Sequence, residues 1–357
     1  MDSSSLKASV APVRVMLVDD SAVVRGMIAQ TLAPDATIVA TAANGAQAIP
    51  LATQHRPDVI VLDVEMPEMD GLTALPKLLE ASPNTRIIMA STLTQRNADI
   101  SLQALSLGAC DYIAKPTSMG GGTVLQDFQR ELRQKVMALG SARKTHVVTI
   151  PKPVAVASAP ARRMLVRAIA IASSTGGPQA LMTVLGGLKG KFLDIPIFIT
   201  QHMPPMFTTI LADHLTRASG RPCHECKDGE VVQPGRIYLA PGDFHMTVEK
   251  QGGAIIAYTN QQPAENFCRP AADPMLRSLS TAYGSGLLTL VLTGMGSDGL
   301  EGAKAVTAAG GAVIAQDEAT SVVWGMPRAV AEKGLCRAVL PLSEIASYII
   351  KATGHAL

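Results

Sequence analysis

The chain has 357 residues, and at ~150 residues per domain this length fits two domains. Apolar residues make up 47% of the chain and charged residues 17%, a balance that excludes a largely disordered protein. The formal net charge of +2 argues against a dedicated nucleic-acid-binding protein.

This net charge is unevenly distributed. Residues 1–120 carry 8 basic and 12 acidic side chains (−4), residues 121–167 carry 9 and 2 (+7), and residues 168–357 carry 14 and 15 (−1). The partition predicts a first domain over 12–140, a basic Pro/Ala-rich linker over 141–167 and a second domain over 168–355. The linker has no aromatic side chains to stack on bases, so we interpret it as solvated rather than as bound to nucleic acid.

Membrane insertion is not expected. The longest charge-free window, 278–297, is broken by four glycines, and its apolar part is strand-sized, whereas a membrane-spanning helix needs about 20 apolar residues. The first residues lack the apolar run of a signal peptide. Cys223 and Cys226 form a Cys-x-x-Cys around His224 without a second ligand pair nearby, so we interpret the cysteines as reduced residues in a loop. Together these features predict a cytoplasmic protein.

The first domain alternates short apolar runs with stretches of helical spacing. Strands are expected at 13–18, 37–40, 58–62, 86–90 and 112–114. Strands separated by helices indicate βαβ units, and hence a doubly wound parallel sheet whose functional residues gather at the carboxyl ends of the strands.

Chemically informative side chains stand at these strand ends: Asp19, Asp20, Asp63, Ser91 and Lys115. Three clustered carboxylates repel one another unless a cation joins them, and oxygen ligands suit Mg²⁺. A lysine can bind a phosphate oxygen, and a carboxylate can attack phosphorus to form an acyl phosphate. A single aspartate is more simply a helix cap, but the set of five predicts a site.

The motifs that hold these residues resemble the receiver domain of bacterial two-component response regulators. They are Val-Asp-Asp-Ser (18–21), Leu-Asp-Val-Glu-Met-Pro-Glu-Met-Asp-Gly (62–71) and Tyr-Ile-Ala-Lys-Pro (112–116). Gly71, which ends the second motif, indicates a turn or a close backbone approach.

The resemblance implies a flavodoxin-like fold and phosphorylation of Asp63 by a histidine kinase. It implies Mg²⁺ bound by Asp19, Asp20, Asp63 and the backbone carbonyl of Glu65. It also implies that the phosphate contacts and the switch pair that reorients on phosphorylation come from Ser91, Tyr112 and Lys115.

The second domain again alternates strands with helices and contains two competing motifs. A hairpin-like region interrupts it, with strands expected at 236–240, 245–248 and 254–258. The first motif, Gly-Met-Gly-Ser-Asp-Gly (294–299), lies between an expected strand at 287–292 and an expected helix at 300–309. This is the position of a dinucleotide-binding fingerprint, and Asp317 follows at a suitable distance for a ribose. A nicotinamide-dependent oxidoreductase is therefore one hypothesis, although the fingerprint usually opens the first βα unit of a domain.

The competing motif predicts nucleophilic catalysis. Ser174 lies in Ile-Ala-Ser-Ser-Thr-Gly-Gly-Pro (171–178), a strand–turn–helix elbow that exposes a serine. His202 follows an expected strand at 195–200, and Asp298 follows the strand at 287–292. His202 would take the serine proton, Asp298 would fix the tautomer of the imidazole, and backbone N–H groups of the glycine-rich turns would hold the oxyanion.

The order Ser…His…Asp differs from that of α/β-hydrolases, and the second domain instead resembles the chemotaxis protein-glutamate methylesterase (CheB) family. The matching motifs are Ser-Ser-Thr-Gly-Gly (173–177), Ile-Thr-Gln-His-Met-Pro (199–204), Leu-Ala-Pro-Gly-Asp-Phe-His (239–245) and Leu-Thr-Gly-Met-Gly-Ser-Asp-Gly (292–299). The family usually has Ile-Gly-Ala-Ser at the elbow, whereas here Ser173 adds a second hydroxyl.

The resemblance implies a Rossmann-like catalytic domain with a β-hairpin insertion. It implies a triad of Ser174, His202 and Asp298 with the backbone N–H of Met295 as oxyanion donor. The glycines of 294–299 would then shape the turn that presents Asp298.

The activity that it implies is hydrolysis of glutamyl methyl esters on chemoreceptors to glutamate and methanol, together with deamidation of glutamine. Ester hydrolysis would need no cofactor. The unphosphorylated receiver would cover the triad, phosphate from the chemotaxis histidine kinase would open it, and the enzyme would be recruited to receptor arrays. A response regulator with a non-catalytic output module is the other alternative.

Overall fold

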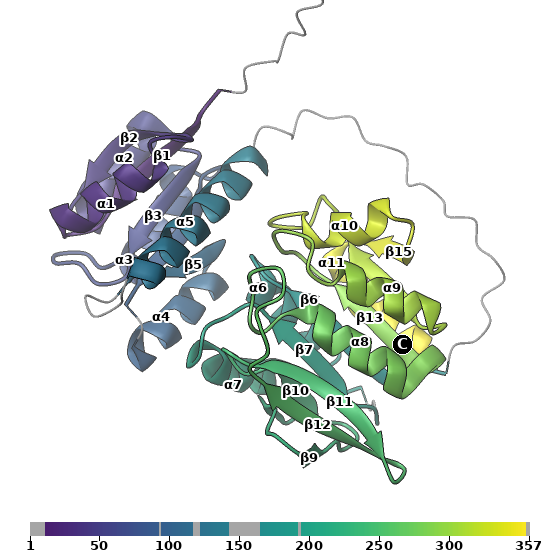
Figure 1. The fold of residues 1–357 in the computed structure, drawn as a ribbon. Helices are drawn as coiled ribbons and strands as arrows, with labels where there is room; N and C mark the ends of the chain where they lie inside the picture. Colours follow the sequence, from purple (N-terminus) through teal and green to yellow (C-terminus); the bar gives the residue numbers. More distant parts are fainter. Residues whose placement is uncertain (1–10, 93, 117–121, 143–164, 192–193, 355–357) are drawn as a thin grey trace, which may run out of the picture. The chain divides into compact units, whose positions relative to one another are not determined.

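The computed structural model describes residues 11–92, 94–116, 122–142, 165–191 and 194–354. The chain forms two compact units, each with its own parallel sheet (Figure 1). The expected α/β class with two doubly wound domains is thereby confirmed. Most of the expected linker, residues 143–164, lies outside the described residues.

The receiver-like unit holds a five-stranded parallel sheet in the order β2-β1-β3-β4-β5, which is the flavodoxin-like order. The strands are β1 (Val13–Val18), β2 (Ala36–Ala42), β3 (Val59–Asp63), β4 (Arg86–Ser91) and β5 (Asp111–Ala114). The helices that alternate with them in the chain are α1 (Ala22–Leu32), α2 (Gly45–His55), α3 (Gly71–Ala81), α4 (Gln95–Ser106) and α5 (Gly122–Ala142).

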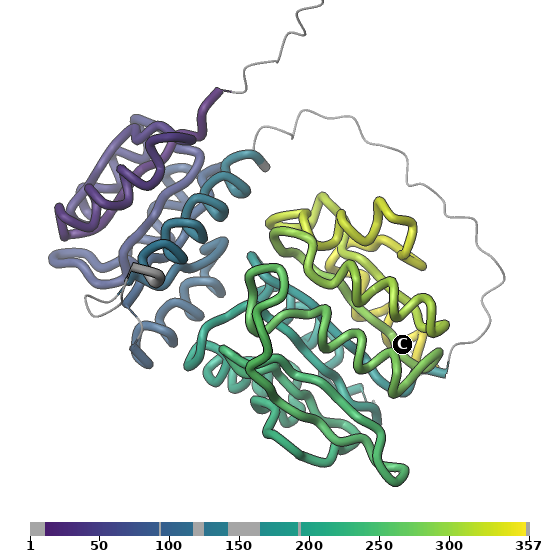
Figure 2. The backbone as a smooth tube through the Cα atoms, in the orientation of Figure 1, coloured from purple at the N-terminus to yellow at the C-terminus, as the bar shows by residue number. Residues whose placement is uncertain are grey.

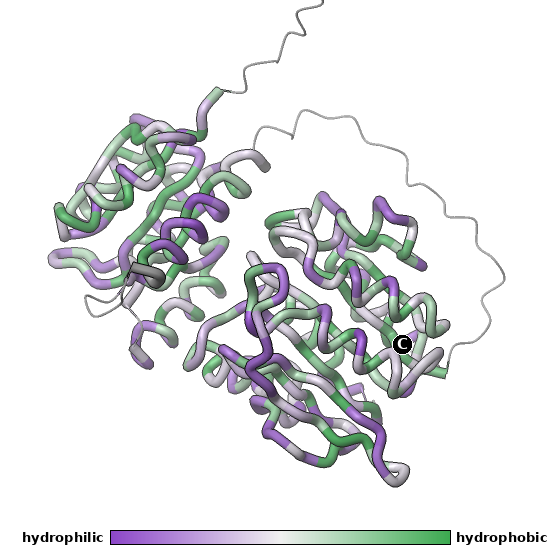
Figure 3. The backbone as a smooth tube through the Cα atoms, in the orientation of Figure 1, coloured by the Kyte–Doolittle hydropathy of each residue, from purple (hydrophilic) through white to green (hydrophobic). Residues whose placement is uncertain are grey.

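Helix α5 illustrates how the hydrophobic pattern sets the packing. Its buried residues Phe128, Leu132, Val136 and Leu139 recur at helical spacing, so they form one apolar stripe along the helix. The alternation of hydrophilic and hydrophobic segments along this helix is visible in Figure 3. The stripe contributes to the hydrophobic core that holds the sheet in place.

The second unit is built on a seven-stranded sheet in the order β15-β14-β13-β6-β7-β10-β8, in which all neighbours are parallel. Its strands are β6 (Ala168–Ser173), β7 (Ile197–Gln201), β8 (Cys223–Glu225), β10 (Ile237–Leu239), β13 (Leu287–Val291), β14 (Ala312–Gln316) and β15 (Cys336–Leu340). The first strand, β6, lies between β7 and β13, so the strand order reverses there. In open α/β sheets such a switch point is where ligands bind.

Two groups of helices accompany this sheet, α6 with α7 and α11, and α8 with α9 and α10. Their bounds are α6 (Gly177–Gly186), α7 (Phe207–Ser219), α8 (Ala272–Tyr283), α9 (Leu300–Ala308), α10 (Met326–Glu332) and α11 (Leu342–Ala352), and a short 3-10 turn, η1 (Gly284–Gly286), follows α8. Among the described residues, none of the helices in either unit has the length and apolarity that crossing a bilayer requires.

A hairpin insertion is present, but its extent differs from the expectation. β11 (His245–Gln251) and β12 (Ala254–Asn260) pair antiparallel and form a small sheet with β9 (Glu230–Val231) (Figure 2). The segment expected as the first hairpin strand, 236–240, is instead β10, a parallel strand of the main sheet. Its three residues are all buried, as is typical of an inner parallel strand. Cys223 likewise lies in β8 and not in a loop.

We predict that Gly71→Ala destabilises the receiver-like unit. An added Cβ at Gly71 would collide with the carbonyl group of Asp63, which confirms the expected close backbone approach. Overpacking of this kind costs about 1–3 kcal/mol, and calorimetry of the full chain would measure the loss. Gly26→Ala is the matched control, because a Cβ at Gly26, inside α1, meets nothing within 4 Å. An equal melting temperature for the two variants would contradict the prediction.

Candidate functional site

Three neighbouring strands bring the expected serine, histidine and aspartate to one edge of the main sheet. Ser174 directly follows β6, His202 directly follows β7, and Asp298 lies in the turn between β13 and α9. The backbone N–H of His202 donates to the carbonyl of Ser173 at 3.2 Å, which ties the first two strand ends together. The predicted residues therefore converge at the switch point of the sheet.

The two serines of the elbow have different environments. Ser173 is fully buried, and its hydroxyl donates to Oε1 of Gln201 at 2.7 Å. The amide of Gln201 in turn donates to the carbonyl of Ser174 at 2.9 Å. Ser174 is only partly buried, and no described residue makes a hydrogen bond with its hydroxyl. The geometry therefore favours Ser174 as the available hydroxyl.

Glycines allow the elbow to pack closely. An added Cβ at Gly177 would collide with the side-chain oxygen of Gln201. At Gly294 an added Cβ would lie 2.9 Å from Cβ of Ser174, so the turn after β13 approaches the serine to within van der Waals contact. The fingerprint glycines thus shape the turn that follows β13 and contacts the elbow.

This turn also exposes a backbone amide. Met295 lies between Gly294 and Gly296, and the φ of Gly296 is +80°, a backbone conformation that favours glycine. Within the described part of the chain, the N–H of Met295 has no hydrogen-bond acceptor. A free amide in a turn that approaches Ser174 is the kind of group that can stabilise an oxyanion.

The carboxylate of Asp298 is held by the N-terminus of α8. Oδ2 accepts the backbone N–H of Ala272 at 2.6 Å, and Oδ1 accepts that of Asp273 at 3.1 Å. Two further donors reach Oδ1, the side-chain amide of Asn266 at 3.1 Å and the backbone N–H of Gly299 at 2.9 Å. Asp298 supplies the cap of this helix from another segment, since its N-cap residue, Ala271, offers no side-chain acceptor.

The same carboxylate binds His202. Oδ2 of Asp298 lies 2.7 Å from Nε2 of His202. Burial alone would raise the pKa of Asp298, but the hydrogen bonds from His202 and from the α8 amides outweigh burial and lower it. Asp298 therefore remains ionised and accepts the Nε2–H, which leaves Nδ1 as the nitrogen that exchanges protons.

Nδ1 of His202 faces a residue that sequence reasoning missed. The sulfur of Cys268 lies 3.4 Å from Nδ1, and no hydrogen bond joins His202 to the Ser174 hydroxyl among the described residues. Burial opposes the charged imidazole, yet the Cys268 sulfur and the Asp298 carboxylate outweigh burial and raise the pKa of His202. The contact with Cys268 thus lies on the ring nitrogen opposite the one that binds Asp298.

Asn266 and Asp273 were also missed. The amide of Asn266 bridges the two carboxylates, 3.0 Å from Asp273 and 3.1 Å from Asp298. Burial and the neighbouring Asp298 raise the pKa of Asp273 to about 6. The only signal in the sequence is an acidic residue in the first turn of a helix, which is ordinary in α-helices.

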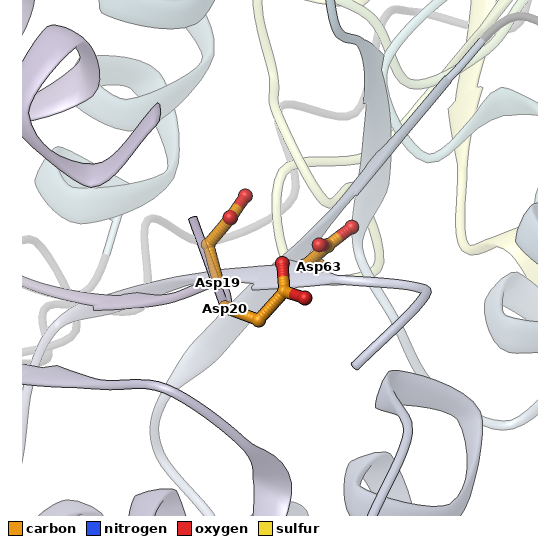
Figure 4. A group of neighbouring side chains, drawn as sticks. All are labelled: Asp19, Asp20 and Asp63. Atoms are coloured by element: carbon orange, nitrogen blue, oxygen red, sulfur yellow. The ribbon is translucent and has the colours of Figure 1, made fainter. Parts of the chain in front are cut away.

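The receiver-like unit gathers its own acidic site. Asp19 and Asp20 follow β1 and Asp63 ends β3, and their ligand atoms lie within 4.8 Å of one another (Figure 4). Nζ of Lys115 lies 2.7 Å from Asp19 and 2.7 Å from Asp63. Three carboxylates against one ammonium leave two negative charges at the site. Its donor set therefore fits a divalent cation with oxygen ligands.

The environment of Asp63 perturbs its ionisation. Burial, opposed by Lys115, raises its pKa to about 6. The backbone N–H of Glu65 donates to Oδ1 of Asp63 at 3.4 Å, which places Glu65 beside the site. A bound cation would stabilise the ionised form of this carboxylate, because the cation offsets the cost of its buried charge.

The remaining predicted receiver residues lie on neighbouring strands. Ser91 ends β4 and is buried, and Tyr112 lies in the adjacent β5 with a buried ring. The backbone N–H of Lys115 donates to the carbonyl of Ser91 at 2.7 Å. The structure thus places both switch candidates in strands that end beside the acidic site.

Two further sequence features, Asp317 after the dinucleotide-like fingerprint and the Cys-x-x-Cys around His224, have structural explanations. The carboxylate of Asp317 accepts the backbone N–H of Thr320 at 3.0 Å, as expected for a turn-capping aspartate. His224 lies 3.0 Å from Glu230, and both Cys223 and Cys226 are free and buried. Within the described residues, only the three receiver aspartates form a group that could hold a metal ion.

Two known families match the chain. Residues 169–349 match the family described as CheB methylesterase, and residues 15–121 match the response regulator receiver domain.

Named relatives span nearly all of the chain. Protein-glutamate methylesterase/protein-glutamine glutaminase 1 of Paramagnetospirillum magneticum is 51% identical over 95% of this chain and 96% of its own. The protein-glutamate methylesterase/protein-glutamine glutaminase of Azospirillum brasilense is 52% identical over 97% of this chain and 94% of its own. The crystal structure of the Thermotoga maritima CheB methylesterase catalytic domain is 41% identical, with a TM-score of 0.51, and covers 52% of this chain and 98% of its own. The chain therefore belongs to the CheB methylesterase family and carries a response regulator receiver domain ahead of the catalytic domain.

Proposed function

We propose that this enzyme hydrolyses glutamyl methyl esters on chemoreceptors and deamidates glutamine side chains, under control of phosphorylation at Asp63. The observation that carries the proposal is the 2.7 Å contact between His202 and Asp298 at the strand edge that holds Ser174. The names of the relatives, at 51% and 52% identity, supply the substrate class.

Nδ1 of His202 takes the proton of the Ser174 hydroxyl, because Nε2 already donates its hydrogen to Asp298. The Ser174 oxygen attacks the ester carbonyl and methanol leaves with the proton from His202, so an acyl-serine remains. Water, deprotonated by the same nitrogen, then releases glutamate. A glutamine side chain follows the same route, with ammonia as the leaving group.

The backbone N–H of Met295 stabilises the oxyanion that forms at the carbonyl. One such donor contributes about 3–4 kcal/mol to transition-state stabilisation. The turn that carries this amide lies against Ser174, since a Cβ added at Gly294 would lie 2.9 Å from the Cβ of Ser174. Ester hydrolysis on this account needs no metal, since a serine, a base and an amide donor complete the chemistry.

In the receiver domain, Asp63 accepts the phosphoryl group of a chemotaxis histidine kinase. The residues that would hold Mg²⁺ are Asp19, Asp20, Asp63 and the backbone carbonyl of Glu65. Bound there, Mg²⁺ supplies positive charge that offsets the carboxylates and the phosphoryl oxygens. Lys115 binds a phosphoryl oxygen, and Ser91 and Tyr112 reorient in response.

Phosphorylation converts the Asp63 carboxylate into an acyl phosphate that carries about −1.5 to −2 charges, and it shifts the enzyme from a form in which the receiver covers the triad to an open form. The domain limits that we propose for this switch are 12–140 for the receiver, 141–167 for the linker and 168–355 for the catalytic domain. Recruitment to receptor arrays would bring the open form to its substrate.

We predict that Ser174→Ala abolishes methanol release from methylated receptor membranes, by about 10⁴-fold or more. Ser173→Ala is the control within the same elbow. It removes a buried hydrogen bond to Gln201, so it should cost about 1–3 kcal/mol of stability but keep most of the turnover. Equal losses of turnover in the two variants would contradict the assignment of Ser174. Absence of methanol release from the unmodified enzyme would favour a non-catalytic output module, or, if the protein binds nicotinamide, an oxidoreductase.

We further predict that Asp63→Asn removes the stimulation of esterase activity by a small phosphodonor, because the acceptor carboxylate is gone. Chelation of Mg²⁺ should remove the same stimulation from the unmodified enzyme and leave its basal rate unchanged. Methanol release with and without phosphodonor measures both effects. Stimulation that survives in Asp63→Asn would show that the control acts elsewhere.

A further inference from the structure

Cys268 contacts Nδ1 of His202, the nitrogen that we propose as the base for Ser174. Its sulfur is 3.4 Å from Nδ1 of His202, while Nε2 of the same ring is 2.7 Å from Asp298. A thiol, an imidazole and a carboxylate are thus in line, the arrangement of a nucleophilic cysteine with an oriented base. The site holds two hydroxyl or thiol groups, Ser174 and Cys268, for one base.

A single turn delivers Cys268 to this position. The backbone N–H of Cys268 donates to the carbonyl of Glu265 at 2.9 Å, and the reverse bond is 3.2 Å. Between them, Asn266 and Phe267 have φ of +52° and +62°, a left-handed conformation that non-glycine residues rarely adopt. The same turn directs Asn266 to Asp298, so the contact of Cys268 with His202 is part of the framework that holds the His–Asp pair.

The other four cysteines have environments that suppress reactivity. Cys110, Cys223 and Cys226 are buried, and burial raises the pKa of each thiol. Cys336 is partly exposed like Cys268, but burial raises its pKa to about 12. Thiol reactivity depends on the thiolate, which a neighbouring imidazole favours and an apolar environment disfavours.

We propose that Cys268 is a modification site that controls the catalytic base: thiol-reactive electrophiles attack this sulfur in preference to the other four, and the adduct shuts off the esterase. The expected loss of esterase activity on modification rests on the proposed role of His202 as base for Ser174.

The chemistry with iodoacetamide is an alkylation. The Cys268 sulfur displaces iodide from the methylene carbon, the S–C bond forms as the C–I bond breaks, and the thiol proton passes to Nδ1 of His202. The resulting carboxamidomethyl group lies against Nδ1. Ser174 then cannot deliver its proton to the base, and turnover stops.

The test treats the full-length enzyme with a limiting amount of iodoacetamide at pH 7. Mass spectrometry follows the label at each cysteine, and methanol release is measured on the same samples. We expect Cys268 to be labelled before Cys336, and the lost fraction of activity to equal the labelled fraction of Cys268. His202→Gln should slow labelling of Cys268 by about tenfold, since a free thiol is only a few per cent thiolate at neutral pH.

Cys268→Ser and Cys336→Ser are the matched variants, each compared with its own untreated rate. Cys268→Ser should become resistant to the reagent, whereas Cys336→Ser should stay as sensitive as the unmodified enzyme. Labelling of Cys336 as fast as Cys268, or full activity after complete labelling of Cys268, would overturn the inference. Ser174→Ala separates the two proposals, because Cys268 in this variant should still be labelled selectively even though no methanol is released.

Discussion

The N-terminus of α8 and the carboxylate of Asp298 form the interaction on which the catalytic site depends. The first amides of a helix lack partners within the helix and attract negative charge, by up to about 2 kcal/mol in partly buried settings. Asp298 supplies that charge from the turn after β13, so one contact caps the helix, keeps the carboxylate ionised and fixes the ring of His202. In the triad that we propose, the serine elbow after β6 then needs only to place Ser174 beside an already oriented base.

Two aspartates show how environment separates two buried carboxylates. Asp298 is almost fully buried but accepts five hydrogen bonds, and its pKa is lowered. Asp63 is also buried but has Lys115 as its main partner and Asp19 beside it, and its pKa is raised to about 6. The first carboxylate serves as a fixed charge. The second is the carboxylate that we propose as phosphoryl acceptor, and a divalent cation beside it would offset the cost of its buried charge.

The strand–helix alternation predicted most of the fold, and the strand-end motifs indicated which side chains gather at the edges of the two sheets. Hydrophobic periodicity located the central strands, and the order of Ser174, His202 and Asp298 at strand ends indicated their convergence. β10 was misplaced because three apolar residues near a hairpin do not reveal which sheet they join. Cys268, Asn266 and Asp273 lie in an irregular turn and at a helix start, where no periodic pattern exists. Their contact with the His–Asp pair arises only from tertiary packing.

The central claim is that Nε2 of His202 donates its hydrogen to Asp298, so that Nδ1 is the nitrogen that exchanges protons. Nitrogen NMR of the full-length enzyme, labelled at its seven histidines and assigned with His202→Gln, tests this claim most directly. As the pH is raised through the pKa of His202, Nδ1 should lose its proton while Nε2 keeps the one donated to Asp298. Loss of the Nε2 proton with retention at Nδ1 would contradict the account.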